Sequence, residues 1–452
     1  MKHLWLWWNK EDVRTEQQQL ADEGVDTSTV DSEFARLLAE DVAEDAEFQK
    51  AMDDLLDKTR LLPMRPDYRY VEPSNLETIR AHRTAGPRAL TISLSEAMRQ
   101  DHIAGAWLGR CAGCLLGKPI EGVLRPRLRQ LLDHFGYEEI PDYIWRLPRL
   151  TEEDCANFGW QSPWKYRNTD CFPGDDDTNY TVMGMALIKQ KGINFTPSDM
   201  ADFWLENIPL LRTCTAERVA YRNFTNNIEP PDSAVDRNPY REWIGARIRA
   251  DFFGYVALGQ PELAAELAWR DASISHVKNG IYGAMWVAAM LAAAMHQTDA
   301  RRIIETGLSE IPEKSRLFEA ITGILNRHAA GDSFSETVQY IHQHWDETRA
   351  HHWCHSISNA QIVAMGLLYG EGDYEKTITR TALACFDTDC NGATVGSIMG
   401  MMQGARALPE KWTGVMNDII HTDLTGYQTT KISKLSEEMF QIHQSMRQVQ
   451  KS

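Results

Sequence analysis

Residues 105–121 read GAWLGRCAGCLLGKPIE, with glycine at every fourth position from Gly105 to Gly117. Residues four apart share one face of an α-helix, so these glycines line a flat face that another backbone can approach closely. The sequence Gly117-Lys118-Pro119 predicts the end of this helix. Glu121 is then expected just past that end. A lone glutamate in such a place is usually only a solvated surface residue.

Long helical patterns lie around this stretch. Apolar residues recur with a period of about 3.6 residues, which predicts helices at Ser93–Leu108, Thr181–Lys191, Pro261–Trp269, Gly280–Met295, Ala300–Glu310, Arg316–Ala330, Phe334–Gln343 and Asn359–Leu368. The sequence contains no convincing run of alternating residues typical of strands, so we expect an all-α fold. The most apolar stretch, Ile281–Met295, is shorter than the roughly 18 to 20 residues that span a bilayer. It is expected to be a helix buried on all sides.

Two irregular segments, 123–175 and 205–245, interrupt the helical pattern. Both contain prolines at irregular spacing, and the first carries Trp145, Trp160 and Trp164. Long structured loops on a helical body often form binding sites. We therefore expect both segments to be loops that contribute to a site.

The first part of the chain differs in composition from the rest. Residues 1–90 are rich in Asp, Glu and Gln, and 31–38 and 47–56 show the spacing of amphipathic helices. A proline cluster at Pro63, Pro66 and Pro73 then punctuates the chain. We expect a helical N-terminal extension over 1–90, packed on the body or on a partner subunit, followed by a catalytic domain over 91–445.

The charge of the chain limits its partners. The formal net charge is −17, and no run of Lys or Arg occurs in the 452 residues. Nucleic acids and anionic membranes are bound by basic patches, so neither is expected as a partner. An acidic surface is most often a solubility feature. Whether the protein forms a homo-oligomer is left open by the sequence.

The eight cysteines are expected to be reduced thiols in a cytoplasmic protein. Residues 1–8 are aromatic but too short for the apolar region of a signal peptide. Cys111 and Cys114 form a C-x-x-C pair, which could indicate zinc or redox chemistry. Because no second pair follows and glycine and alanine surround them, we interpret them as small residues at a helix contact.

Three adjacent carboxylates, Asp175, Asp176 and Asp177, precede Thr178 and a helical pattern. Asp and Thr are good helix N-caps, but one of these residues would satisfy that role. Adjacent carboxylates repel each other, and carboxylate clusters suit magnesium, calcium or manganese. The run therefore favours metal binding.

A second acidic motif, Asp387-Thr388-Asp389, precedes a helical segment rich in small residues at 393–402. The same motif occurs in ordinary loops and caps, so alone it is a moderate signal. A helix of small residues brings the turn before it close to another element. Together the two motifs supply five carboxylates, a number that suits two divalent ions sharing one site.

In their order along the chain, these three segments resemble the ADP-ribosylglycohydrolase family, which includes dinitrogenase reductase activating glycohydrolase and the ADP-ribosyl-acceptor hydrolases. The matching stretches are Gly113–Glu121, Asp175–Thr178 and Phe386–Cys390. The resemblance runs from about Asp101 to Gly404. It implies an all-α orthogonal bundle that holds two Mg²⁺ or Mn²⁺ ions.

The resemblance also implies roles for single residues. Carried over by position, the metal ligands are Asp176, Asp177, Asp387 and Asp389. Asp175 stands where the family has a liganding Thr or Ser and is expected to replace it as a ligand. Cys390 stands where the family has a liganding Thr, and a thiol is a poor magnesium ligand. Glu121 matches the glutamate that approaches the metals and the scissile bond.

Further positions resemble the substrate-binding region of the family. Segment 245–249 is similar to its diphosphate loop, and His276 stands at the start of a substrate-lining helix, although a structural role fits His276 equally well. The expected substrate contacts are Gly245, Arg249, His276, Asn279 and, more weakly, His355. Two departures bear on the substrate: Cys114 replaces an Asp of the first motif, and Trp243-Ile244 replaces the Gly-Asn of the diphosphate loop.

These expectations combine into a metal-dependent hydrolase that cleaves an N- or O-glycosidic bond to ribose, in a small molecule or an ADP-ribosylated substrate. Glu121, Asp176 and Asp389 are the expected catalytic residues. The altered diphosphate loop favours an alternative, a hydrolase of a smaller ribosyl or glycosyl metabolite or of a nucleoside-like compound. A non-catalytic protein that binds ADP-ribose or a sugar is the second alternative.

Overall fold

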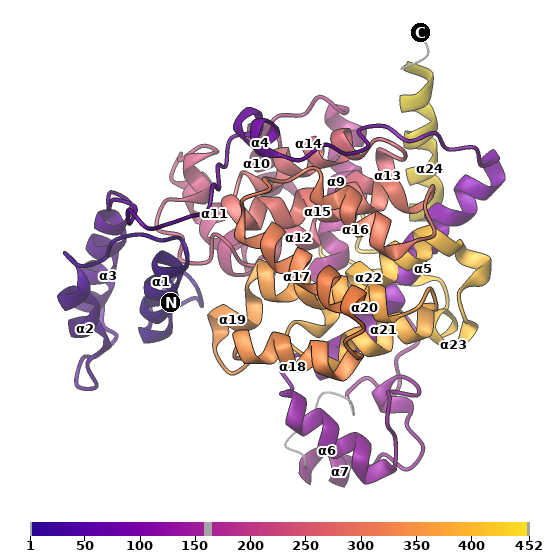
Figure 1. Ribbon diagram of the computed structural model, residues 1–452, viewed down its shortest axis with the longest axis horizontal. Coiled ribbons are helices and arrows are strands. Elements are labelled where there is room, and N and C mark those ends of the chain that lie inside the picture. Colours follow the sequence, from indigo (N-terminus) through magenta and orange to yellow (C-terminus); the bar gives the residue numbers. More distant parts are fainter. Residues whose placement is uncertain (1, 158–164, 450–452) are drawn as a thin grey trace.

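Helices α5 (Glu96–Gly117) and α22 (Thr388–Gln403) form an antiparallel pair inside the helical body (Figure 1). Their backbones touch through small residues in reverse order: Gly105 faces Gly400, Gly109 faces Gly396, Gly113 faces Gly392, and Gly117 faces Thr388. A β-carbon at any of these four glycines of α5 would overlap a backbone carbonyl group of α22. The glycine face expected from the sequence is therefore the contact between two backbones.

The pairing fixes which ends of the two helices meet. Because α5 and α22 are antiparallel, the last turn of α5 lies at the first turn of α22. The hydroxyl of Thr388 donates a hydrogen bond to the carbonyl oxygen of Gly117 at 2.9 Å, which pins the two ends together. Glu121 and the Asp387-Thr388-Asp389 motif therefore lie at the same end of the pair.

The structure, a computed structural model, describes residues 2–157 and 165–449. Most regular structure in this part is helical, which confirms the all-α fold class. Besides α5 and α22, the helices are α1 (Lys10–Asp22), α2 (Asp31–Leu38), α3 (Ala46–Thr59), α4 (Leu76–His82), α6 (Arg125–Phe135), α7 (Glu152–Asn157), α9 (Asp176–Lys191), α10 (Pro197–Asn207), α11 (Thr215–Thr225), α12 (Gly245–Ile248), α13 (Asp251–Val256), α14 (Pro261–Ala272), α15 (Lys278–Ala294), α16 (Ala300–Leu308), α17 (Arg316–Ala330), α18 (Phe334–His344), α19 (Ala350–Cys354), α20 (Ser356–Tyr369), α21 (Tyr374–Leu383), α23 (Glu410–Thr413) and α24 (Ile432–Val449). Short 3₁₀ turns are η1 (Lys118–Ile120), η2 (Ile144–Arg146), η3 (Leu210–Arg212), η4 (Asp232–Ala234), η5 (Ala405–Ala407) and η6 (Gly414–Met416).

The core forms around the central pair. Helices α15, α20 and α21 pack on α22, and α24 packs on α5. Residues 279–294 of α15 are all buried, so the prediction of a helix surrounded on all sides is confirmed. In the described part of the chain, no helix is long and apolar enough to cross a membrane.

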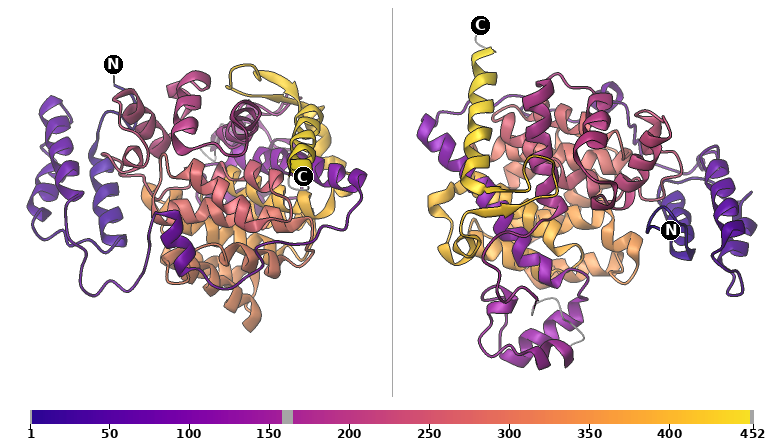
Figure 2. Two further views of the ribbon diagram at one scale, coloured as in Figure 1. Left: turned by 90° about the horizontal axis from the view of Figure 1, so that it is seen from above. Right: turned by 180° about the vertical axis from the view of Figure 1, so that it is seen from behind.

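Two predictions of irregular structure were partly wrong. Segment 123–175 contains α6 and α7, which stand out from the body as a small lobe (Figures 1 and 2). Segment 205–245 contains α11. Pro126 lies in the first turn of α6, and the other described prolines of the two segments lie between helices, where they limit a helix without breaking it. Trp160 and Trp164 lie outside the described residues.

The one sheet among the described residues is a short antiparallel hairpin that the sequence did not predict. Strand β1 (Ile419–His421) pairs with β2 (Thr429–Lys431), with Ile420 opposite Thr430. Each strand has only three residues, too few for an alternating pattern to be recognised. Phe172 adds a parallel bridge to Ile420, which ties the chain before the first aspartate motif to this hairpin.

The N-terminal extension stands beside the body, with α1, α2 and α3 to one side (Figures 1 and 2). Helix α1 docks on residues 240–242. The guanidinium of Arg241 donates to the carboxylates of Glu16 and Glu23, each at 2.6 Å, and the amide of Gln19 donates to Glu242 at 2.7 Å. The packing of 1–90 against the body thus relies on buried ionic contacts.

Replacing Gly113 by Ala should destabilise the protein strongly. The added methyl group would overlap the carbonyl oxygen of Gly392, and neither backbone can move without shifting a whole helix. Overpacking of this kind costs about 3 kcal/mol, measurable as a lower urea midpoint. Gly323→Ala in α17 is the control, because its β-carbon would meet only Tyr340 at 3.7 Å. An equal effect of both changes would contradict the account of the helix contact.

Replacing Arg241 by Met should loosen the extension while leaving the body folded. The change leaves Glu16 and Glu23 buried without their guanidinium partner, and breaking such a pair typically costs about 3–5 kcal/mol. Amide hydrogen exchange in α1 should accelerate more than in α15. Arg14→Met is the control, because Arg14 is exposed and its ion pair with Glu11 lies within its own helix. Unchanged exchange in α1 would refute the role of this pair.

Candidate functional site

The first aspartate motif begins helix α9. The backbone N–H of Phe172 donates to the carbonyl oxygen of Ile419 at 2.8 Å, which fixes the chain just before the motif. Asp175 is the N-cap of α9, and its carboxylate accepts a hydrogen bond from the N–H of Asp177 at 2.9 Å. The capping role considered from the sequence therefore belongs to Asp175. Asp176 and Asp177 occupy the first turn.

Carboxylates from three segments converge at the joined ends of α5 and α22. Three sets of side chains each offer ligand atoms within 4.8 Å of one another: Glu121, Asp387 and Asp389; Asp177, Asp389 and Cys390; Cys114, Asp175 and Asp177. Asp389 belongs to the first two sets and Asp177 to the last two. The sets therefore form one continuous cluster, which we call the acidic centre. Asp176 belongs to none of the sets.

Asp387 and Asp389 are buried, and neither forms an ion pair with a cationic side chain among the described residues. One carboxylate oxygen of each, Oδ1, is buried without a hydrogen-bond partner among the described residues. Burial, reinforced by Asp389, raises the pKa of Asp387 well above its usual value. Burial, reinforced by Asp175, also raises the pKa of Asp389. Unpaired buried carboxylates are costly, and a divalent cation would relieve that cost.

Glu121 extends the acidic centre to the surface. Its side chain is exposed, in contrast to the buried Asp387 and Asp389. Repulsion from Asp389, added to partial desolvation, raises the pKa of Glu121 to about 9. The oxygens of Glu121, Asp387 and Asp389 form a hard donor set that fits magnesium or manganese.

Asp175 and Asp177 have cationic protein partners. The ammonium group of Lys118 contacts the carboxylate of Asp175. Burial opposes the charge on Asp175, but Lys118 outweighs it and the pKa of Asp175 is lowered. Arg110 donates to the carbonyl oxygen of Asp177 at 2.7 Å and to its carboxylate at 3.2 Å. Burial still raises the pKa of Asp177 well above its usual value.

Asp176 and the two cysteines complete the surroundings. Burial and then Asp175 raise the pKa of the half-buried Asp176 to about 8. Burial raises the pKa of the thiols of Cys114 and Cys390 well above the usual value, so both are protonated and poor ligands. Cys111 is a free, buried thiol in the same helix. The interpretation of Cys111 and Cys114 as small residues at a helix contact fits this placement.

Four of the expected substrate contacts lie outside the acidic centre, in ionic or hydrogen-bonded networks. The guanidinium of Arg249 donates to Asp271 at 2.7 Å and to Glu217 at 2.9 Å. The remaining three are Gly245, packed against the carboxylate of Glu217; His276, bonded to the hydroxyl of Ser275 at 2.8 Å; and Asn279, which donates to Glu72 and Glu242 at 2.8 Å. Burial lowers the pKa of His276 well below its usual value, so the ring is neutral.

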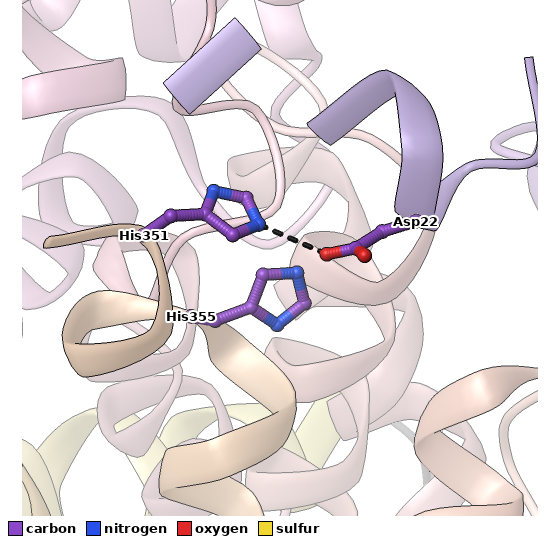
Figure 3. Close-up of side chains that lie close together, drawn as sticks. All are labelled: Asp22, His351 and His355. Atoms are coloured by element: carbon purple, nitrogen blue, oxygen red, sulfur yellow. Dashed lines mark hydrogen bonds and ion pairs between the residues drawn. The ribbon is translucent and has the colours of Figure 1, made fainter. Parts of the chain in front are cut away.

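His355, the fifth expected contact, belongs to a separate cluster with His351 and Asp22 (Figure 3). The indole N–H of Trp243 donates to Nδ1 of His351, and the backbone N–H of Ile357 donates to Nδ1 of His355, both at 3.1 Å. Both partners can only donate, so the ring protons reside on Nε2. Nε2 of His351 donates to Asp22 at 3.1 Å.

The ring protons decide the role of this histidine cluster. A metal ion needs the lone pair of Nε2, but Nε2 carries the proton in both rings. Burial lowers the pKa of His351 to about 4, so the ring is neutral at physiological pH. The cluster therefore serves as a hydrogen-bonded contact between the N-terminal extension and the body.

Two residues near the acidic centre were not expected from the sequence. Arg247 donates to the amide oxygen of Asn391 at 2.5 Å, and its Nε and Nη1 atoms lack partners among the described residues. Burial lowers the pKa of Arg247 to about 10, although Cys390 and Asp387 oppose this shift. The half-buried ring of Tyr166 lies 5.6 Å from the Trp145 ring, and burial raises its pKa, with Lys118 and Asp175 close enough to act on it. Arg247 lies in segment 245–249, which resembles the diphosphate loop of the family, so the sequence could have indicated it.

The model of the ADP-ribosylglycohydrolase family matches residues 95–448, which confirms the resemblance seen in the sequence. None of the curated proteins matches the chain significantly. Among solved structures, one described as an ADP-ribosylglycohydrolase-related protein complex is similar over 77% of this chain and 99% of its own, with 18% identity and a TM-score of 0.49. On the match to the family model, this chain belongs to the ADP-ribosylglycohydrolase family.

Proposed function

We propose that the protein is a divalent-metal-dependent hydrolase that cleaves an N- or O-glycosidic bond to ribose. Membership in the family indicates glycohydrolase activity in general. The observation that carries the finer proposal is the set Glu121, Asp387 and Asp389, in which Oδ1 of each aspartate is buried without a hydrogen-bond partner among the described residues. Such a donor set suits Mg²⁺ or Mn²⁺.

The residues of the acidic centre would have different roles in such a reaction. A divalent cation held by Asp387 and Asp389 would supply positive charge to the sugar hydroxyls and to the attacking water. Glu121 reaches solvent and can exchange a proton with that water or with the leaving group. Asp176, whose pKa is raised to about 8, is a second group that can hold or release a proton near neutral pH during bond cleavage.

The surroundings of the centre favour a small ribosyl substrate. The half-buried Tyr166, which lies near Lys118 and Asp175, offers an aromatic ring of the kind that suits a sugar face. Nε and Nη1 of the buried Arg247 have no partner among the described residues and would serve as donors to sugar oxygens. Trp243 and Ile244 are both buried, and the indole N–H of Trp243 is bonded to His351. These side chains cannot offer the backbone approach and polar contacts that a diphosphate needs.

Removing the carboxylates should abolish stabilisation by metal. Adding Mg²⁺ or Mn²⁺ to the wild-type protein should raise its apparent Tm, since a ligand at 100 times its Kd stabilises by about 2.7 kcal/mol. The double change Asp387→Asn with Asp389→Asn should remove this shift. Asp299→Asn, which preserves an N-cap far from the centre, is the control. A shift that survives the double change would place the metal elsewhere.

If the substrate is a small ribosyl compound, the protein should bind ADP-ribose little more tightly than ribose or ribose 5-phosphate. In calorimetric titrations under saturating Mg²⁺, ribose, ribose 5-phosphate and ADP-ribose should bind within about tenfold of one another, a difference of about 1.4 kcal/mol. Arg247→Lys should weaken all three to a similar extent, because its donors serve the sugar. ADP-ribose binding that is far tighter than the other two would restore the diphosphate-containing substrate class.

A further inference from the structure

The acidic centre has two halves with different charge balance. On one side, the carboxylates of Asp175 and Asp177 face the cations of Lys118 and Arg110. On the other side, Glu121, Asp387 and Asp389 have no ion pair among the described residues. There, Oδ1 of Asp387 and Oδ1 of Asp389 also lack a hydrogen-bond partner. Charge therefore draws an added cation to the second side.

The position of Lys118 is fixed by the contact between the helices. It follows Gly117, whose backbone touches that of Thr388 and accepts the hydroxyl hydrogen bond of Thr388. The Lys118 side chain is only 19% exposed, and the Asp175 side chain that it contacts is 2% exposed. An ammonium group held beside a buried carboxylate in this way is screened little by solvent.

We propose that the ammonium of Lys118 is a built-in cation that occupies the Asp175 side of the acidic centre. The chain then binds a single divalent ion tightly, at Glu121, Asp387 and Asp389. This inference rests on the proposed metal dependence and specifies its stoichiometry. It differs from the expectation of two metal ions drawn from the sequence.

Two physical arguments support a single tight site. First, a divalent ion on the Asp175 side would have to displace the ammonium of Lys118 from the carboxylate or lie beside that ammonium. Two cations in contact with one carboxylate repel each other strongly. Second, Asp175 already uses its other oxygen to cap α9 through the N–H of Asp177. Asp175 therefore has a hydrogen-bond donor on each of its two oxygens, whereas Asp387 and Asp389 each have one oxygen without a partner among the described residues.

The test counts bound ions without using activity. Equilibrium dialysis with Mn²⁺, read together with electron paramagnetic resonance, should give one ion per wild-type chain with an uncoupled signal. Lys118→Met and, in parallel, Lys118→Gln should bind a second ion at least tenfold more tightly than the wild type does, with an exchange-coupled signal. Lys118→Arg keeps the charge and should bind one.

The controls separate this inference from the proposed function. Lys189→Met removes an exposed lysine from α9 and should leave one ion bound. Two tight ions in the wild type, or one in both Lys118→Met and Lys118→Gln, would overturn the role of Lys118 while leaving a metal-dependent enzyme. No Mn²⁺ bound by any of these proteins would overturn both the inference and the proposed metal dependence.

Discussion

The close contact between the backbones of α5 and α22 is the constraint on which the rest of the structure depends. Glycine at every fourth position of α5 allows it, and the antiparallel direction decides which ends meet. Because the last turn of α5 lies at the first turn of α22, Glu121 comes to the aspartates of the second motif. The packing and the site are therefore one arrangement, and a methyl group added to the helix contact would disturb both.

Concentrating buried carboxylates opposes folding, and the protein offsets this cost unevenly. Lys118 and Arg110 neutralise Asp175 and Asp177, whereas Asp387 and Asp389 keep bare oxygens. A site that binds a cation tightly is expected to destabilise the folded protein while it is empty. The repulsion between its carboxylates lowers stability, and a bound cation relieves that repulsion. An added cation is therefore expected to bind most favourably beside Asp387 and Asp389.

Local patterns in the sequence predicted the helical class, the buried helix at 281–295 and the three segments that form the acidic centre. They did not predict α6 or α11, because prolines near helix ends resemble prolines in loops. They also named Arg249 as a substrate contact and passed over Arg247, which contacts Asn391 of α22. Both arginines stand in one short segment, and only long-range partners such as Asp271 and Asn391 distinguish them. The docking of the extension through Arg241 has no local signal either.

The central claim is that the acidic centre is a divalent-cation site anchored on α22. Anomalous diffraction at the manganese edge, from crystals grown with Mn²⁺, tests it most directly. The account predicts a peak between the carboxylates of Glu121, Asp387 and Asp389, and none beside His351 and His355, whose Nε2 atoms carry protons. A manganese peak at the histidine cluster, or an acidic centre without a peak, would contradict it.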